Sequence, residues 1–131
     1  MKSVKTSRAE QYLHDTLTWE RALDFYKQEN AFLKTRLSQI LDNNTGKDFV
    51  EMAEHFNNRF VFTDDYIASL MQDLWQQKSM LQAAVKGLPA NDKLINKYQQ
   101  KLQAEMEGFE KGIAELKREF NRQVVSYMRI S

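Results

Sequence analysis

Two histidines are the side chains in this sequence that titrate near neutral pH, and each follows a glutamate by four residues: Glu10 precedes His14, and Glu51 precedes His55. On a helix this spacing places both side chains of a pair on one face, where they would supply two ligands to a metal ion. The two pairs lie far apart along the expected helices, so they do not form one shared site. Metal sites in carboxylate bundles use Glu-x-x-His, which this chain lacks. We therefore predict no bound metal and ordinary surface contacts for both pairs.

No other group of residues matches a catalytic or cofactor-binding motif. Asp64 and Asp65 are adjacent, and adjacent side chains on a helix do not face each other, so the two carboxylates do not converge for acid-base catalysis. The chain has no cysteine, which excludes disulfides, thiolate metal sites and a cysteine nucleophile. It also lacks a glycine-rich phosphate loop and a nucleophile elbow. The sequence predicts a protein that is not an enzyme and holds no cofactor.

The clearest structural pattern lies between residues 19 and 40, where seam residues recur at alternating spacings of four and three. These residues are Trp19, Leu23, Tyr26, Asn30, Leu33, Leu37 and Ile40. The spacing is typical of a helix with a coiled-coil-like seam. Such a seam must be covered by other helices of similar length.

Two later segments supply those helices. The second continues the same spacing through Phe49, Ala53, Phe56, Phe60, Thr63, Ile67, Leu70, Leu74, Gln77, Leu81 and Ala84. The third places Leu94 or Ile95, then Tyr98, Leu102, Met106, Phe109, Ile113, Leu116, Phe120, Val124 and Tyr127 on one face. Its steps are often four, which is closer to a straight 3.6-residue period than to a strict coiled coil.

Capping signals set the expected helix boundaries. Ser7 with Glu10 and Asp48 with Glu51 fit capping boxes, and Asn91 or Asp92 can cap the third helix. Gly87 followed by Pro89 ends the second helix.

We predict helices at 7–42, 49–86 and 91–129 in a single domain of residues 1–131. The fold class is all-α, an antiparallel up-down-up bundle of three long helices. The β-prone residues before Thr63 leave open a break there, but the apolar phase is unchanged across it, so one continuous helix is favoured.

Matching the heights of antiparallel helices predicts two aromatic core layers. One contains Trp19, Trp75, Tyr98 and Leu102, and the other contains Phe56, Phe60, Phe120 and Tyr127. The polar seam residues Asn30, Thr63 and Gln77 are expected to fix the register of the helices, with Asn30 and Thr63 within reach of one another.

Several apolar residues fall outside the seams. Phe25 and Phe32 lie a heptad apart on an outer face of the first helix, and Val61, Phe62 and Trp75 form an outer group on the second. Trp75 is ambiguous, because its height also suits a core layer. An apolar patch of this kind is seldom left open in a monomer. We predict these five residues as the partner-binding surface. Gly108 and Gly112, four apart on the third helix, indicate either a close approach by a neighbour or a tolerated position on a solvent-exposed face.

The leading functional interpretation is a non-enzymatic module that self-associates, most simply as a homodimer, or docks another helical protein. The alternative is a small-molecule or metal-binding bundle. Nucleic-acid binding is not expected, because the net charge is +1 and the cationic residues Lys117, Arg118, Arg122 and Arg129 lie at the opposite end of the bundle from the basic N-terminus. No signal peptide or apolar span is visible, so we expect no membrane association and a cytoplasmic location.

Overall fold

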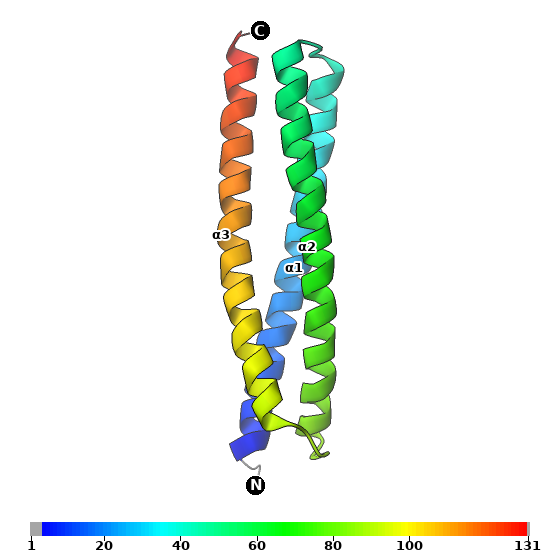
Figure 1. Ribbon diagram of the computed structural model, residues 1–131, viewed down its shortest axis with the longest axis vertical. Helices are drawn as coiled ribbons and strands as arrows, with labels where there is room; N and C mark the ends of the chain where they lie inside the picture. Colours follow the sequence, from blue (N-terminus) through cyan, green and yellow to red (C-terminus); the bar gives the residue numbers. More distant parts are fainter. Residues whose placement is uncertain (1–3, 131) are drawn as a thin grey trace.

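A computed structural model of the chain contains three long α-helices in an up-down-up order (Figure 1). α1 spans Val4–Asp42, α2 spans Lys47–Val85 and α3 spans Asp92–Ile130, and each has 39 residues. The structure describes the backbone of residues 4–130 and the side chains of residues 8–126, and this range contains no strand. The predicted all-α antiparallel three-helix bundle is confirmed.

The observed helix ends correct two of the predicted caps. α1 begins at Val4, before Ser7, because no glycine or proline interrupts helical hydrogen bonding there; the Ser7 side chain lies outside the described residues. α2 is capped by Gly46 in an extended conformation, so Asp48 lies in the first helical turn instead of at the cap. At that position a carboxylate interacts favourably with the positive, N-terminal end of the helix dipole.

The connection between α2 and α3 follows the sequence closely. Gly87 has a φ of 80°, and the amides of Gly87 and Leu88 donate to the carbonyls of Ala84 and Ala83. This pair of bonds is a Schellman motif, which needs glycine at the left-handed position. Asn91 then caps α3 by accepting the Leu94 amide proton at 3.0 Å.

α2 runs through the β-prone stretch without a break, as predicted. Thr63 is buried, and its hydroxyl donates to the Arg59 carbonyl at 2.8 Å within the same helix. That bond satisfies the threonine locally, so it does not need to cap a new helix.

The core follows the predicted seams of α1 and α2. Every predicted seam residue of α2 is buried except Ala84, which is partly buried. The Phe56, Phe60 and Phe120 rings form the predicted aromatic layer, with the Phe120 centroid 5.4 Å and 5.3 Å from the other two. The Tyr127 side chain, predicted in this layer, lies outside the described residues. The other predicted layer is wrong at Trp75 and Tyr98, which are 57% and 39% exposed.

The error at Tyr98 has a specific cause in the seam of α3. The buried residue is its neighbour, Gln99, which is 3% exposed. With Gln99 included, residues 95, 99, 102, 106, 109, 113, 116 and 120 alternate strictly by four and three. The α3 seam is therefore coiled-coil-like up to Phe120, and the expectation of a straight 3.6-residue period is wrong over this range. A buried polar side chain concealed the pattern.

Two polar contacts connect the helices inside the core. The Asn30 amide donates to the Phe60 carbonyl at 2.8 Å and to the Asp64 carboxylate at 2.7 Å. The sequence indicated that Asn30 and Thr63 are within reach of one another. In the structure the Asn30 amide bonds to Phe60 and Asp64 instead. The Gln77 amide donates to the Ile95 carbonyl and to the Gln99 side chain, each at 2.9 Å.

The Gln99 amide extends this second contact to the third helix. It donates to the Tyr12 carbonyl at 3.2 Å, so Gln77 and Gln99 join α2, α3 and α1 in one layer. The carbonyl oxygen of Gln77 is buried and accepts no hydrogen bond from the described residues. Such a layer favours one register of the helices at a cost in stability.

We expect the Gln77→Leu variant to be less stable than the wild type, and the Gln77→Leu/Gln99→Leu variant to recover that loss. The single change removes the donor to the buried Gln99 oxygen, and an unsatisfied buried acceptor costs about 1–3 kcal/mol. The double change removes both polar groups and buries apolar carbon instead. Urea unfolding of the three proteins measures the difference, and a double variant less stable than the single one would contradict the prediction.

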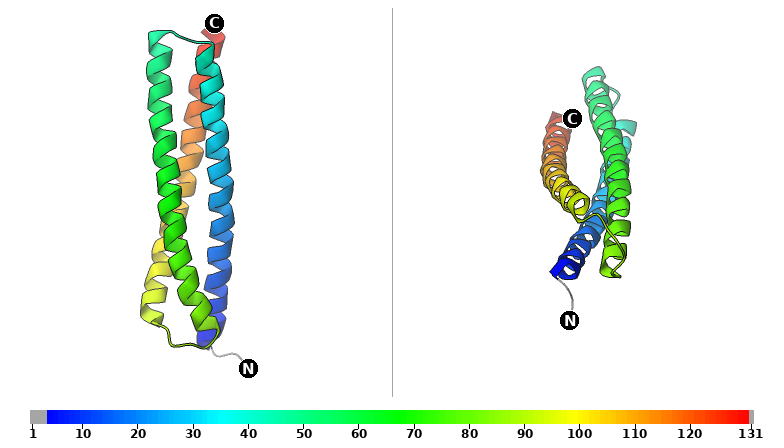
Figure 2. Two further views of the ribbon diagram at one scale, coloured as in Figure 1. Left: turned by 90° about the vertical axis from the view of Figure 1, so that its right-hand side faces the viewer. Right: turned by 60° about the horizontal axis from the view of Figure 1, so that its bottom comes forward.

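α1 and α2 pack more closely with each other than α3 packs with either. Figure 2 shows α1 and α2 running side by side, with α3 lying over the line between them. Ion pairs connect each pair of helices: Lys34 with Asp64, Glu29 with Lys117, and Arg59 with Glu119. Because α3 packs less closely with either helix than α1 and α2 pack with each other, space opens between α3 and the α1–α2 pair.

Candidate functional site

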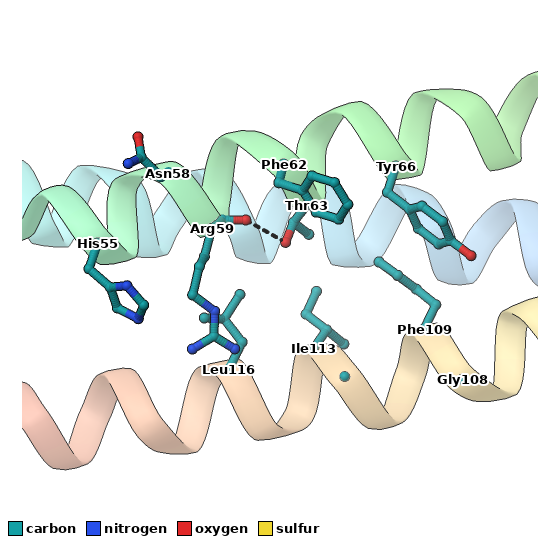
Figure 3. Close-up of a pocket in the computed structure, with 11 residues that line it drawn as sticks. His55, Asn58, Arg59, Phe62, Thr63, Tyr66, Gly108, Phe109, Ile113 and Leu116 are labelled. Carbon is teal, nitrogen blue, oxygen red and sulfur yellow. Dashed lines mark hydrogen bonds between the residues drawn. The ribbon is translucent and has the colours of Figure 1, made fainter.

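An open groove of about 540 Å³ lies between α2 and α3 and is called the α2–α3 groove (Figure 3). It is lined by His55, Asn58, Arg59, Phe62, Thr63, Tyr66, Gly108, Phe109, Gly112, Ile113 and Leu116. On α2 these positions lie mostly one residue before the seam residues, so they face α3 and the adjacent solvent. Ile113 and Leu116 belong to the seam of α3 and form the apolar floor.

Aromatic rings form one wall of the groove. Tyr66 stacks on Phe109, with centroids 5.7 Å apart and planes inclined by 26°. Burial raises the pKa of the Tyr66 hydroxyl, and the charges of Glu105 and Asp73 raise it further, so the phenol stays protonated at neutral pH. Phe62 projects from α2 at the mouth of the groove and is 71% exposed, more than any other large apolar side chain of residues 8–126.

Glycine forms the opposite wall. A Cβ atom added to Gly108 or Gly112 would meet no other atom within 4 Å. Neither glycine is therefore needed to let α1 or α2 approach, and each weakens α3 by about 1 kcal/mol relative to alanine. The sequence left two interpretations of these glycines, a close approach by a neighbour or a tolerated position on an exposed face. Within the described chain no neighbour approaches them closely. The glycines leave an open surface at which another chain can approach the α3 backbone closely.

An ion pair closes one end of the groove. Arg59 donates to the Glu119 carboxylate at 2.7 Å. This hydrogen bond lowers the pKa of Glu119, and the charges of Arg59, His55 and Arg122 lower it further, although partial burial opposes the shift. His55 thus lies close to Glu119 of α3, and its ring also contacts Phe56 at 5.3 Å in an edge-to-face arrangement. Arg59, His55 and Arg122 thus surround the Glu119 carboxylate at this end of the groove.

The structure separates the five predicted partner-binding residues onto different faces. All five are exposed: Phe25 60%, Phe32 64%, Val61 46%, Phe62 71% and Trp75 57%. Only Phe62 lines the groove. Phe25 and Phe32 share a face of α1 with Glu29, which binds Lys117, so they lie on the other side of α3. Val61 and Trp75 lie two heptads apart on a different face of α2. The five residues therefore do not form one continuous patch, and their role in binding stays a prediction.

Sequence reasoning missed Tyr66, Thr63 and Ile113 as site residues. Tyr66 sits one residue before a seam position, as Phe62 does, so the repeated offset from the seam was the available signal. The sequence places Thr63 and Ile113 in the core. They also line the groove because α2 and α3 are separated at this height.

The groove's openness bears on what it can bind. Its volume is within the range of small-molecule sites, but such sites enclose most of the ligand surface. Phe62 and Asn58 are exposed at its mouth, so a small ligand would remain largely in water. No group of three or more histidine, aspartate or glutamate side chains within residues 8–126 is arranged to hold a metal ion.

Comparison with protein-family models, with curated proteins and with solved structures found no match. In the part of the chain that the structure describes, none of the helices has an apolar stretch sufficient to cross a lipid bilayer.

Proposed function

We propose that this protein is a non-enzymatic helical module that forms a homodimer through the α2–α3 groove. One observation carries the proposal. Phe62, the most exposed aromatic side chain of residues 8–126, stands beside a groove whose α3 side includes Gly108 and Gly112, where an added Cβ would meet no atom within 4 Å. A projecting ring and an open cavity on the same face are self-complementary, which is what a two-fold interface requires.

The energetic argument favours burial of this face. Phe62 and Tyr66 expose apolar carbon to water, and a buried aromatic side chain typically covers 150–250 Å² of surface. Removing that area from water on both copies is favourable at about 25 cal/mol per Å². Close approach to Gly108 and Gly112 adds van der Waals contacts with the α3 backbone that a side chain there would block.

Charge supports a second copy as the occupant. Exposed side chains of both signs lie next to the groove, with Asp65 adjacent to Tyr66 on α2 and Lys111 adjacent to Gly112 on α3. The same face therefore carries both signs of charge, so a copy of it can supply the complementary groups.

The test is a Gly108→Gln/Gly112→Gln variant, compared with the wild type by light scattering and sedimentation across concentration. Glutamine is a better helix former than glycine, and a Cβ atom at either position meets no atom of the same chain within 4 Å, so the folded monomer should be at least as stable. The added side chains fill the groove, and overpacking of 1–3 kcal/mol should raise the dimer dissociation constant about tenfold or more.

The matched control is Phe25→Glu/Phe32→Glu, which changes an exposed face of α1 outside the groove. It should leave the dissociation constant unchanged. A wild-type protein that is monomeric at every concentration would overturn the proposal. Dissociation by the α1 control but not by the glycine variant would overturn it too and would place the interface on α1, as the sequence pattern alone suggests.

A further inference from the structure

We infer that the two copies are related by a two-fold axis parallel to the helices, so that α2 of each copy lies against α3 of the other. This inference rests on the proposed homodimer and adds its symmetry, its register and the charged pair that selects them. The arrangement places four helices around the axis, two from each copy. Every helix is antiparallel to both of its neighbours, as in an up-down four-helix bundle.

The shapes of the two groove walls favour this axis. On the solvent side of the groove α2 carries the bulky rings of Phe62 and Tyr66, whereas α3 carries the exposed Gly108 and Gly112 beside a floor of Phe109, Ile113 and Leu116. A parallel axis places the bulky wall of one copy on the small wall of the other. An axis across the helices would place bulky against bulky and glycine against glycine, which leaves a void that forfeits packing.

Asp65 and Lys111 supply matching charges at the same height. Tyr66 stacks on Phe109 and Arg59 binds Glu119 across the groove. Asp65 and Lys111 lie between these two pairs along α2 and α3, so they are at the same height. Both Asp65 and Lys111 are exposed, and neither forms an ion pair with another residue of the range 8–126.

A two-fold axis parallel to the helices keeps every residue at its own height. It therefore brings Asp65 of each copy opposite Lys111 of the other, and the contact occurs twice in the dimer. A charge pair at the rim of an apolar interface selects register and orientation more than it adds affinity.

Charge reversal tests this register. Asp65→Lys or Lys111→Asp alone places like charges opposite each other twice, and we expect the dimer dissociation constant to rise about tenfold or more. The Asp65→Lys/Lys111→Asp variant restores both pairs and should return to within about threefold of the wild type. Both residues are exposed, so the monomer should fold normally, which circular dichroism can verify. A double variant as weak as either single one would contradict the inference.

Cysteine cross-linking tests the symmetry, because the natural chain has no cysteine. Asp65→Cys and Lys111→Cys proteins are prepared separately, mixed under reducing conditions and then oxidised. We expect disulfide-linked dimers in the mixture and little linkage in either protein alone. Efficient linkage of the Asp65→Cys protein with itself would indicate α2 against α2 and would overturn the inference.

The outcomes separate this inference from the proposed function. If light scattering shows a dimer that the glycine variant dissociates, but charge reversal and cross-linking fail, the groove is the interface and the arrangement is wrong. If light scattering shows only a monomer, the proposed function fails first, and the arrangement fails with it.

Discussion

Replacing Phe120 by alanine is expected to lower the free energy of unfolding by about 3–5 kcal/mol, the largest loss for a single side chain of this bundle. Phe120 is fully buried and contacts Phe56 and Phe60 edge-to-face. Together with Leu116 and Val124 it packs α3 against the α1–α2 pair at this end of the bundle. Removing the ring leaves a cavity that three long, stiff helices cannot collapse to fill.

The matched control for Phe120 is Phe32→Ala, which removes the same ring from a site that is 64% exposed. Surface changes of this kind stay within about 0.5 kcal/mol. Urea or thermal unfolding followed by circular dichroism measures both variants. A Phe120→Ala protein no less stable than Phe32→Ala would show that α3 is not held by this aromatic layer.

The Asn30→Asp variant is expected to lose at least about 3 kcal/mol, although it changes only one atom of the side chain. The Asn30 amide is fully buried and donates to the Phe60 carbonyl and to the Asp64 carboxylate. Aspartate has no donor to offer either group, and it would place a second carboxylate beside Asp64, with Lys34 as the nearby cation.

Asn30→Leu separates charge from the loss of hydrogen bonds. Leucine removes the same two donors but introduces no charge, and it also removes an amide oxygen that is buried without a partner in the described chain. Replacing a buried polar group by an apolar one of similar size is often neutral or stabilising. The unfolding free energy of Asn30→Leu should therefore stay near that of the wild type. If both variants lose the same amount, the hydrogen bonds matter and the charge does not.

The stability of a dimer adds one requirement to all of these measurements. If the chain self-associates, dissociation and unfolding are linked, so the apparent stability depends on protein concentration. Each variant should be compared with the wild type at one fixed concentration. This linkage also makes the concentration dependence of the wild-type melting temperature an independent sign of self-association.

The sequence by itself determined the number, length and direction of the helices. Its alternating spacing of four and three, its scarcity of glycine and proline and the Gly87 and Asn91 signals act locally, so they can be read without knowing what packs where. The same pattern identified the buried residues of α2, those of α1 from Leu23 onward but not Ala9 and Thr16, and the exposure of Phe25, Phe32 and Phe62. It failed at Gln99, because a polar side chain is buried only when partners on other helices satisfy it.

Only the tertiary structure decided how far apart the helices lie. The separation of α3 from α2 depends on side chains from both helices at once, and no periodicity in one helix encodes it. That separation turns Thr63 and Ile113 toward a groove, leaves Gly108 and Gly112 facing open space, and places Phe62 on a different side of α3 from Phe25 and Phe32. The sequence could thus indicate that apolar residues face outward, but the packing of three helices decides which of them share a surface.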